Sequence, residues 1–107
     1  MTLESIENDS WGELPTDATR LMETVHLLRR KPIETFTVED LRILVAQGVG
    51  LAVVVPMALA ELEQNPLAEG DMYPGDLLAA MARVPSAYWD QHPREAARFA
   101  ALPTKPE

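Results

Sequence analysis

The sequence predicts an all-α fold, a compact single-domain bundle of about five short helices with Pro- and Gly-rich connections. Three observations favour this fold class. Apolar residues recur at spacings of three and four along several segments, which is the period of a helix with one buried face. Thr, Pro and Gly residues stand where these segments begin and end. The chain has 107 residues, the usual length of one domain, so we expect a single domain over residues 1–107.

The N-terminal part is predicted to contain an arm followed by one amphipathic helix. Residues 1–15 form the arm, and Trp11 is expected to anchor it to the domain surface. The helix is predicted over 16–30, because Thr16 is a suitable N-cap and apolar residues follow at helical spacing. Near its end stand three cations suited to the negative end of the helix dipole, Arg29, Arg30 and Lys31.

The second predicted helix has the clearest start signal in the sequence. Thr37 is its N-cap, two carboxylates follow in the first turn, and Gly48 is a natural C-cap. Its predicted buried face consists of Leu41, Leu44 and Val45.

Residues 50–64 combine two opposing preferences. Residues 53–55 are three valines, which favour a strand, whereas residues 57–64 are strongly helical. Because Pro56 fits the first turn of a helix, we predict a buried turn or short helix over 50–55 and a new helix over 56–64. A single buried strand over 50–55 is the alternative, although the sequence offers it no obvious pairing partner.

The C-terminal part is predicted to contain two helices separated by a short turn. Pro74 is expected at the first position of the first helix, which extends to Val84. A short turn is expected over 86–92, and Pro93 opens the last helix. Residues 103–107 are expected to form a frayed tail.

The charge balance narrows the classes of partner. The sequence has 17 acidic and 9 basic residues, a net charge of −8, which repels nucleic-acid phosphates and anionic lipids and attracts a basic protein. We therefore expect no nucleic-acid and no membrane partner. The longest apolar run, 49–60, is also shorter than the roughly 20 residues needed to cross a bilayer. An alternative explanation is that the acidity serves only solubility.

Acidic residues concentrate in one part of the chain. The segment 61–82 has five carboxylates and no Lys or Arg, so it carries −5 of the net charge. Within it, residues 65–78 form an acidic connection that is interrupted by Pro and Gly residues. This connection lies between two apolar helical patterns, and we treat it as the candidate functional segment.

A metal site or hydrolase is the first alternative function for this segment. It would be centred on residues 69–76, with ligands drawn from Glu69, Asp71, Asp76 and the distant His92. Calcium loops place ligands at alternate positions, and here those positions hold Tyr73 and Gly75 with no closing Glu. The sequence also has no cysteine, no Gly-x-Ser-x-Gly elbow and no phosphate-binding loop. We therefore predict no catalytic residue, no metal and no cofactor.

The most specific run in the sequence is Pro66-Leu67-x-Glu69-Gly70-Asp71-x-Tyr73-x-Gly75-Asp76-Leu77-Leu78. Further segments that share its resemblance are 9–12, 28–32, 36–42, 47–51 and 55–59. With these segments, nearly the whole chain to about Asp90 resembles the immunity proteins of contact-dependent growth inhibition (CDI) systems. The resemblance implies a cytoplasmic, non-catalytic bacterial protein that binds the cognate C-terminal toxin domain. Such toxins are commonly nucleases, and the immunity protein would cover the active site or lock the toxin inactive.

The candidate contact surface follows from the acidic connection. Aromatic residues beside acids suit an interface to a basic protein, because rings serve as anchors and carboxylates as charge partners. The expected toxin-binding residues, to which Glu63 could contribute, are Glu61, Glu69, Asp71, Tyr73 and Asp76. We expect a monomer that binds one toxin. A structural or dimerising module is the second alternative.

Overall fold

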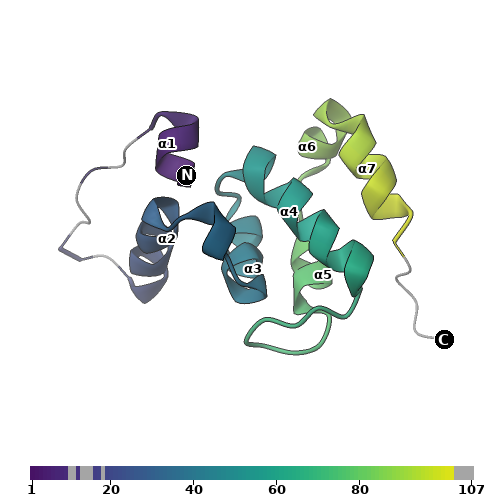
Figure 1. The fold of residues 1–107 in the computed structure, drawn as a ribbon, viewed down its shortest axis with the longest axis horizontal. Coiled ribbons are helices and arrows are strands. Elements are labelled where there is room, and N and C mark those ends of the chain that lie inside the picture. Colours follow the sequence, from purple (N-terminus) through teal and green to yellow (C-terminus); the bar gives the residue numbers. More distant parts are fainter. Residues whose placement is uncertain (10–11, 13–15, 18, 103–107) are drawn as a thin grey trace. The chain divides into compact units, whose positions relative to one another are not determined.

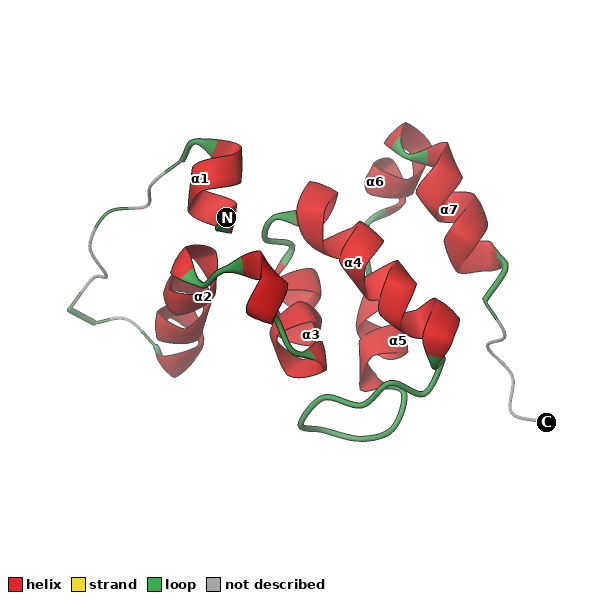
Figure 2. Ribbon diagram, viewed as in Figure 1, coloured by secondary structure: helices red, strands yellow, loops and turns green. Residues whose placement is uncertain are grey.

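The computed structural model describes residues 1–9, 12, 16–17 and 19–102, and these residues form helices, turns and no strand (Figure 2). The all-α prediction is confirmed, and the strand considered for 50–55 is not formed. Trp11 and the predicted tail over 103–107 lie outside the described residues. The chain divides into two compact units, residues 1–36 and residues 37 onward. The single domain over 1–107 stays a prediction.

The first unit begins with α1 (Leu3–Glu7), a helix within the expected arm that sequence periodicity did not predict. A capping box starts it, in which the Thr2 and Ser5 side chains each accept the backbone N–H of the other residue at 3.1 Å. Asn8 ends it in the left-handed conformation. Five residues are too few to show a helical period, so only the caps could have indicated this helix.

The second helix of this unit, α2 (Arg20–Arg30), begins later than the predicted start near residue 16, because Thr19 is the N-cap in place of Thr16. Its arginines do more than complement the helix dipole. Arg29 is buried and donates to Glu7 and to the Asp9 carbonyl, while Arg30 pairs with Glu4 at 3.2 Å. These contacts join α2 to α1. A short 3-10 helix, η1 (Ile33–Thr35), closes the unit.

The second unit begins with α3 (Val38–Gln47), and its predicted caps are confirmed. Thr37 and Asp40 form a capping box, with both side-chain bonds to backbone N–H groups near 3 Å. Gly48 ends the helix at a φ of 70°, a conformation that other residues adopt only with strain. The predicted face of Leu41, Leu44 and Val45 is buried.

The next helix, α4 (Leu51–Gln64), corrects the predicted boundary at Pro56. The helix runs through this proline, which is its sixth residue, instead of starting there. Proline has no N–H for the Ala52 carbonyl, but Ala52 is exposed, so water can reach that carbonyl. Val54 and Val55 just before the proline are fully buried. Burial of this face outweighs the local cost of proline, a tertiary effect that the local pattern does not contain.

The three remaining helices are α5 (Asp76–Met81), α6 (Ser86–Gln91) and α7 (Pro93–Ala100). Pro93 is at the first position of α7, as predicted. Pro74 is not at the first position of α5. It lies in a turn, Gly75 at a φ of 88° precedes the helix, and α5 ends at Met81 rather than at residue 84. Residues 86–91 form a helix where the sequence predicted only a turn.

The core of the second unit lies where α4 packs against α3 and α5, while α6 and α7 pack together and α7 also contacts α4 (Figure 1). Its largest fully buried side chains are Leu41, Leu44, Val54, Val55, Leu59, Leu62, Leu77 and Met81. Among the described helices, none is long and apolar enough to cross a membrane. The connection between α4 and α5 leaves this core as an extended loop over residues 65–75.

Candidate functional site

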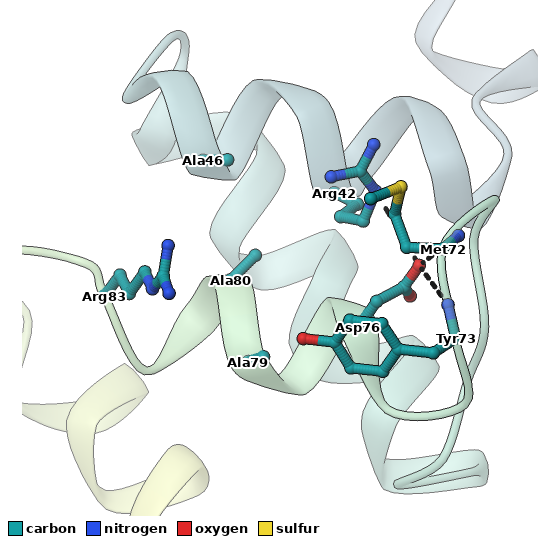
Figure 3. A pocket seen from close by; sticks show the side chains of 8 residues that line it. All are labelled: Arg42, Ala46, Met72, Tyr73, Asp76, Ala79, Ala80 and Arg83. Carbon is teal, nitrogen blue, oxygen red and sulfur yellow. Dashed lines mark hydrogen bonds and ion pairs between the residues drawn. The ribbon is translucent and has the colours of Figure 1, made fainter.

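Asp76, the first residue of α5, holds the 65–75 loop from inside. Its carboxylate accepts the backbone N–H of Gly70 at 2.7 Å, of Met72 at 3.1 Å and of Tyr73 at 3.5 Å. The side chain is almost completely buried, with the residue only 3% exposed. The loop therefore folds around this one carboxylate, and Figure 3 shows its bonds to the backbone of Met72 and Tyr73.

The charge of Asp76 is stabilised despite its burial. Burial raises the pKa of this carboxyl. The three hydrogen bonds from backbone N–H groups and the positive charge of Arg42 together lower it by more, so the pKa lies below its ordinary value. The Arg42 Nε lies 3.7 Å from Asp76 Oδ2. Because its oxygens are already occupied by protein donors, Asp76 is a structural carboxylate in this arrangement.

A second carboxylate, Glu39 on α3, holds the loop from the neighbouring helix. Its two oxygens accept a pair of hydrogen bonds from the Arg42 guanidinium, at 2.6 Å from Nε and 2.5 Å from Nη2. The Oε1 atom also accepts the Asp71 N–H at 2.8 Å. The bond from Arg42 is the largest cause that lowers the pKa of Glu39, burial opposes it, and the Asp71 N–H lowers it further. Glu39 therefore connects α3 to the loop.

Gly70 lets the loop approach α3 this closely. A Cβ atom at this position would lie 3.1 Å from the Glu39 Cα and 3.1 Å from an Asp76 oxygen, closer than side-chain carbons normally come. The requirement for glycine here is therefore steric. It explains why the glycine stands between Glu69 and Asp71 in the most specific run of the sequence.

The outer face of the loop is exposed and partly apolar. Leu67 is 59% exposed, Met72 65% and Tyr73 51%, and the side chains of Glu69 and Asp71 are also exposed. The structure thus brings three of the expected contact residues, Glu69, Asp71 and Tyr73, to one exposed loop. Leu67 and Met72 were not singled out from the sequence, although apolar residues in a Pro- and Gly-rich loop have no helical face to bury and could have been noticed.

The other expected contact residues have different environments. Asp76 lies beneath the loop rather than on its outer face. Glu61 lies on α4, is exposed, and forms no hydrogen bond or ion pair through its side chain with the described residues. Glu63 pairs with Arg98 of α7 at 2.7 and 3.0 Å, and this hydrogen bond lowers the pKa of Glu63. Glu63 therefore joins two helices.

The structure does not assemble the alternative metal site. Among the described residues, no three His, Cys, Asp or Glu side chains are placed to hold a metal ion. The His92 ring stacks on Tyr88 with the centroids 3.9 Å apart, and its Nδ1 lies 2.8 Å from the Tyr88 carbonyl. His92 thus packs at the junction of α6 and α7, while Asp76 is occupied by the loop.

A pocket of about 200 Å³ opens beside the loop, between α3 and α5 (Figure 3). We call it the α3–α5 pocket. Its lining residues are Arg42 and Ala46 from α3, Met72 and Tyr73 from the loop, and Asp76, Ala79, Ala80 and Arg83 from α5 and the turn after it. The alanines leave room between the two arginines and the loop side chains.

Comparison with known proteins gave one finding. A family model described as CDI immunity proteins matches residues 5–99, which includes α2 to α6 and nearly all of α7. No curated protein and no solved structure matched the chain.

Proposed function

Because the chain belongs to the family of CDI immunity proteins, we propose that it protects its own cell by binding the cognate CDI toxin domain. Binding, without catalysis, is its activity, and it acts in the cytoplasm as a monomer that holds one toxin domain. The contact surface is the outer face of the 65–75 loop with Glu61. One observation carries the proposal of this contact surface. The 65–75 loop is fixed from beneath by Asp76 and Glu39, and it exposes apolar and acidic side chains on its outer face.

Rigidity of the loop favours binding because little freedom remains to be lost in the complex. The Asp76 carboxylate accepts three hydrogen bonds from backbone amides of the loop, and Glu39 accepts one from the Asp71 amide. Together these bonds fix four successive backbone positions, residues 70–73. Asp76 thus contributes to the surface from beneath rather than as a contact residue.

The exposed side chains are of the kinds that dominate protein interfaces. Tyr and Met are enriched at protein interfaces, and a few well-packed residues, among which Tyr is over-represented, carry most of the binding energy. Tyr73 and Met72 present such groups on the loop, and Leu67 adds exposed apolar surface. They would insert into the toxin surface, with Glu69 and Asp71 beside them.

The charge of the protein indicates the kind of toxin. A nuclease needs a basic surface to hold phosphates, and the acidic segment 61–82 complements such a surface. We infer that the cognate toxin is a basic nuclease and that the immunity protein covers its active site or locks it inactive.

The test is a double charge reversal on the loop. Glu69→Lys with Asp71→Lys changes the net charge from −8 to −4 and leaves Asp76 and Glu39 in place. We expect association with the toxin to slow by about tenfold, because exposed interface charges act mainly on the association rate. Protection of cells that express the toxin should weaken in parallel.

The matched control reverses two exposed acids elsewhere, with Asp17→Lys and Asp90→Lys. It changes the net charge equally, so it should slow association much less if the loop makes the contact. Equal slowing in both variants would show that only the overall charge matters. Unchanged binding by the loop variant would reject the loop as the contact surface.

Sedimentation addresses the alternative of a dimerising module. We expect the free protein to sediment as a monomer and the mixture with toxin as a one-to-one complex. A stable dimer that fails to bind the toxin domain would favour the alternative.

A further inference from the structure

The α3–α5 pocket is suited to a single side chain of a protein partner. Its volume is about 200 Å³, below the roughly 300 Å³ at which small-molecule and cofactor sites begin. It borders the exposed loop residues Met72 and Tyr73 and lies within the second unit. A partner that binds the loop would therefore also meet this pocket.

The groups available in the pocket are hydrogen-bond donors. Asp76 is the only carboxylate among the lining residues, and its oxygens already accept three N–H groups. Arg42 is engaged by Glu39 on two nitrogens. The Arg83 side chain, in contrast, is exposed and forms no hydrogen bond or ion pair with any residue that the structure describes. Its guanidinium offers five N–H donors in a planar fork.

The shape of the pocket brings an occupant to Arg83. Figure 3 shows Arg83 and Tyr73 on opposite sides of the space that Ala79 and Ala80 leave open. Small side chains on the floor let an incoming group lie flat against α5. The Tyr73 ring and the Met72 side chain line the side of the pocket away from Arg83, so an occupant would contact the loop as well as Arg83.

We propose that the α3–α5 pocket receives an Asp or Glu side chain of the bound toxin and that Arg83 pairs with its carboxylate. This inference rests on the proposed function. Arginine and carboxylate form two parallel hydrogen bonds, so the pair fixes geometry as well as charge. All charged residues of the segment 61–82, which ends just before Arg83, are acidic. Arg83 therefore places a positive charge beside an acidic surface. A toxin that presents a basic residue there is repelled, so the pocket selects the cognate partner.

The test compares Arg83→Glu with Arg94→Glu, which reverses an exposed arginine on α7. Both variants change the net charge from −8 to −10, so attraction of a basic toxin over long range increases equally in both. We nevertheless expect Arg83→Glu to weaken the affinity by tenfold or more, while Arg94→Glu binds at least as tightly as the wild type. Arg83→Ala should weaken binding less than Arg83→Glu, because it removes the pair without adding repulsion.

A charge exchange identifies the occupant. Each exposed acid on the toxin is replaced by Lys, and one replacement should restore binding to Arg83→Glu while weakening binding to the wild type. If Arg83→Glu binds as tightly as Arg94→Glu, or if no replacement restores binding, the inference is wrong although the immunity function stands. If the wild type itself fails to bind the toxin, the proposed function fails first. Circular dichroism of each variant checks that it is folded.

Discussion

At the scale of single residues, Gly70 shows how one position without a side chain sets the position of the loop. We predict that Gly70→Ala lowers the free energy of unfolding by about 1–3 kcal/mol, the usual cost of an added group in a packed site. The added methyl would meet the Glu39 backbone and the Asp76 carboxylate, each at 3.1 Å. Urea unfolding monitored by circular dichroism measures the change.

The same substitution should weaken toxin binding, because the loop must move away from α3 to admit the methyl group. For stability, Glu69→Ala is the matched control, since Glu69 is the exposed neighbour of Gly70 and its side chain has no hydrogen bond within the described residues. It should change the free energy of unfolding by less than about 0.5 kcal/mol. Equal stability of Gly70→Ala and the wild type would mean that the loop does not depend on this close approach.

At the scale of structural elements, the two carboxylates that hold the loop make its stability depend on pH. Asp76 and Glu39 both have a lowered pKa in the folded protein. The unfolded chain therefore binds more protons than the folded one once the pH falls to the unfolded pKa values of about 4, and the free energy of unfolding rises with pH between the folded and the unfolded pKa. The contribution is fully present above the unfolded pKa and is lost as the pH falls through the folded pKa.

Asp76→Asn tests this assignment. It should lower the free energy of unfolding at pH 7 and reduce the slope of this free energy with pH in the acid range where these carboxyls titrate, because one of the two carboxyls with a lowered pKa is removed. Asp90→Asn, at an exposed position on α6, should keep the slope of the wild type. An unchanged slope in Asp76→Asn would mean that the loop does not depend on the negative charge of this carboxylate.

The α4 helix carries a prediction of its own, because it contains Pro56 in its sixth position. Pro56→Ala should raise the free energy of unfolding by about 1 kcal/mol, since alanine supplies the missing N–H and fits the helix. The gain is smaller than the full cost of proline because the unfolded chain becomes more flexible and some ring packing is lost. Pro93→Ala is the control, because at the first position of α7 no N–H is needed. A loss of stability in Pro56→Ala would mean that packing of the ring dominates.

The same elements show what the sequence could predict. The start of α3 at Thr37, its end at Gly48 and the start of α7 at Pro93 depend on neighbouring residues only, and all three were predicted correctly. Pro56 and Pro74 were assigned by the same local rules and wrongly. For Pro56, burial of α4 against other helices decides the structure. For Pro74, the loop that folds around the Asp76 carboxylate decides it, through side-chain bonds that the local rules for proline do not include.

The candidate site was predictable to a similar extent. The charge and the Pro and Gly residues located the acidic loop, on which Glu69, Asp71 and Tyr73 are exposed. Their role in binding stays a prediction. The bond between Glu39 and the Asp71 amide joins residues 32 positions apart, and no spacing rule reveals it. The burial of Asp76 follows from that tertiary arrangement, so the sequence could not assign it to the inside of the loop.

At the scale of the whole molecule, the net charge of −8 should govern how fast the toxin is captured. We predict that the association rate with a basic toxin falls by about tenfold between 0.01 and 0.15 M salt, as the screening length decreases from about 30 to about 8 Å. The dissociation rate should change little, because it depends mainly on the buried anchors. Stopped-flow or surface binding measurements at several salt concentrations give both rates.

The variant with Glu69→Lys and Asp71→Lys provides the control for this dependence, because it halves the net charge and reverses the charge of the proposed contact loop. Its association rate should vary less with salt than that of the wild type and should approach the wild-type rate when the salt is high. An association rate of the wild type that does not respond to salt would mean that the toxin surface is not basic where it meets this protein. The apolar anchors Leu67, Met72 and Tyr73 would then account for recognition, and neutralisation would not require that the toxin present a phosphate-binding surface.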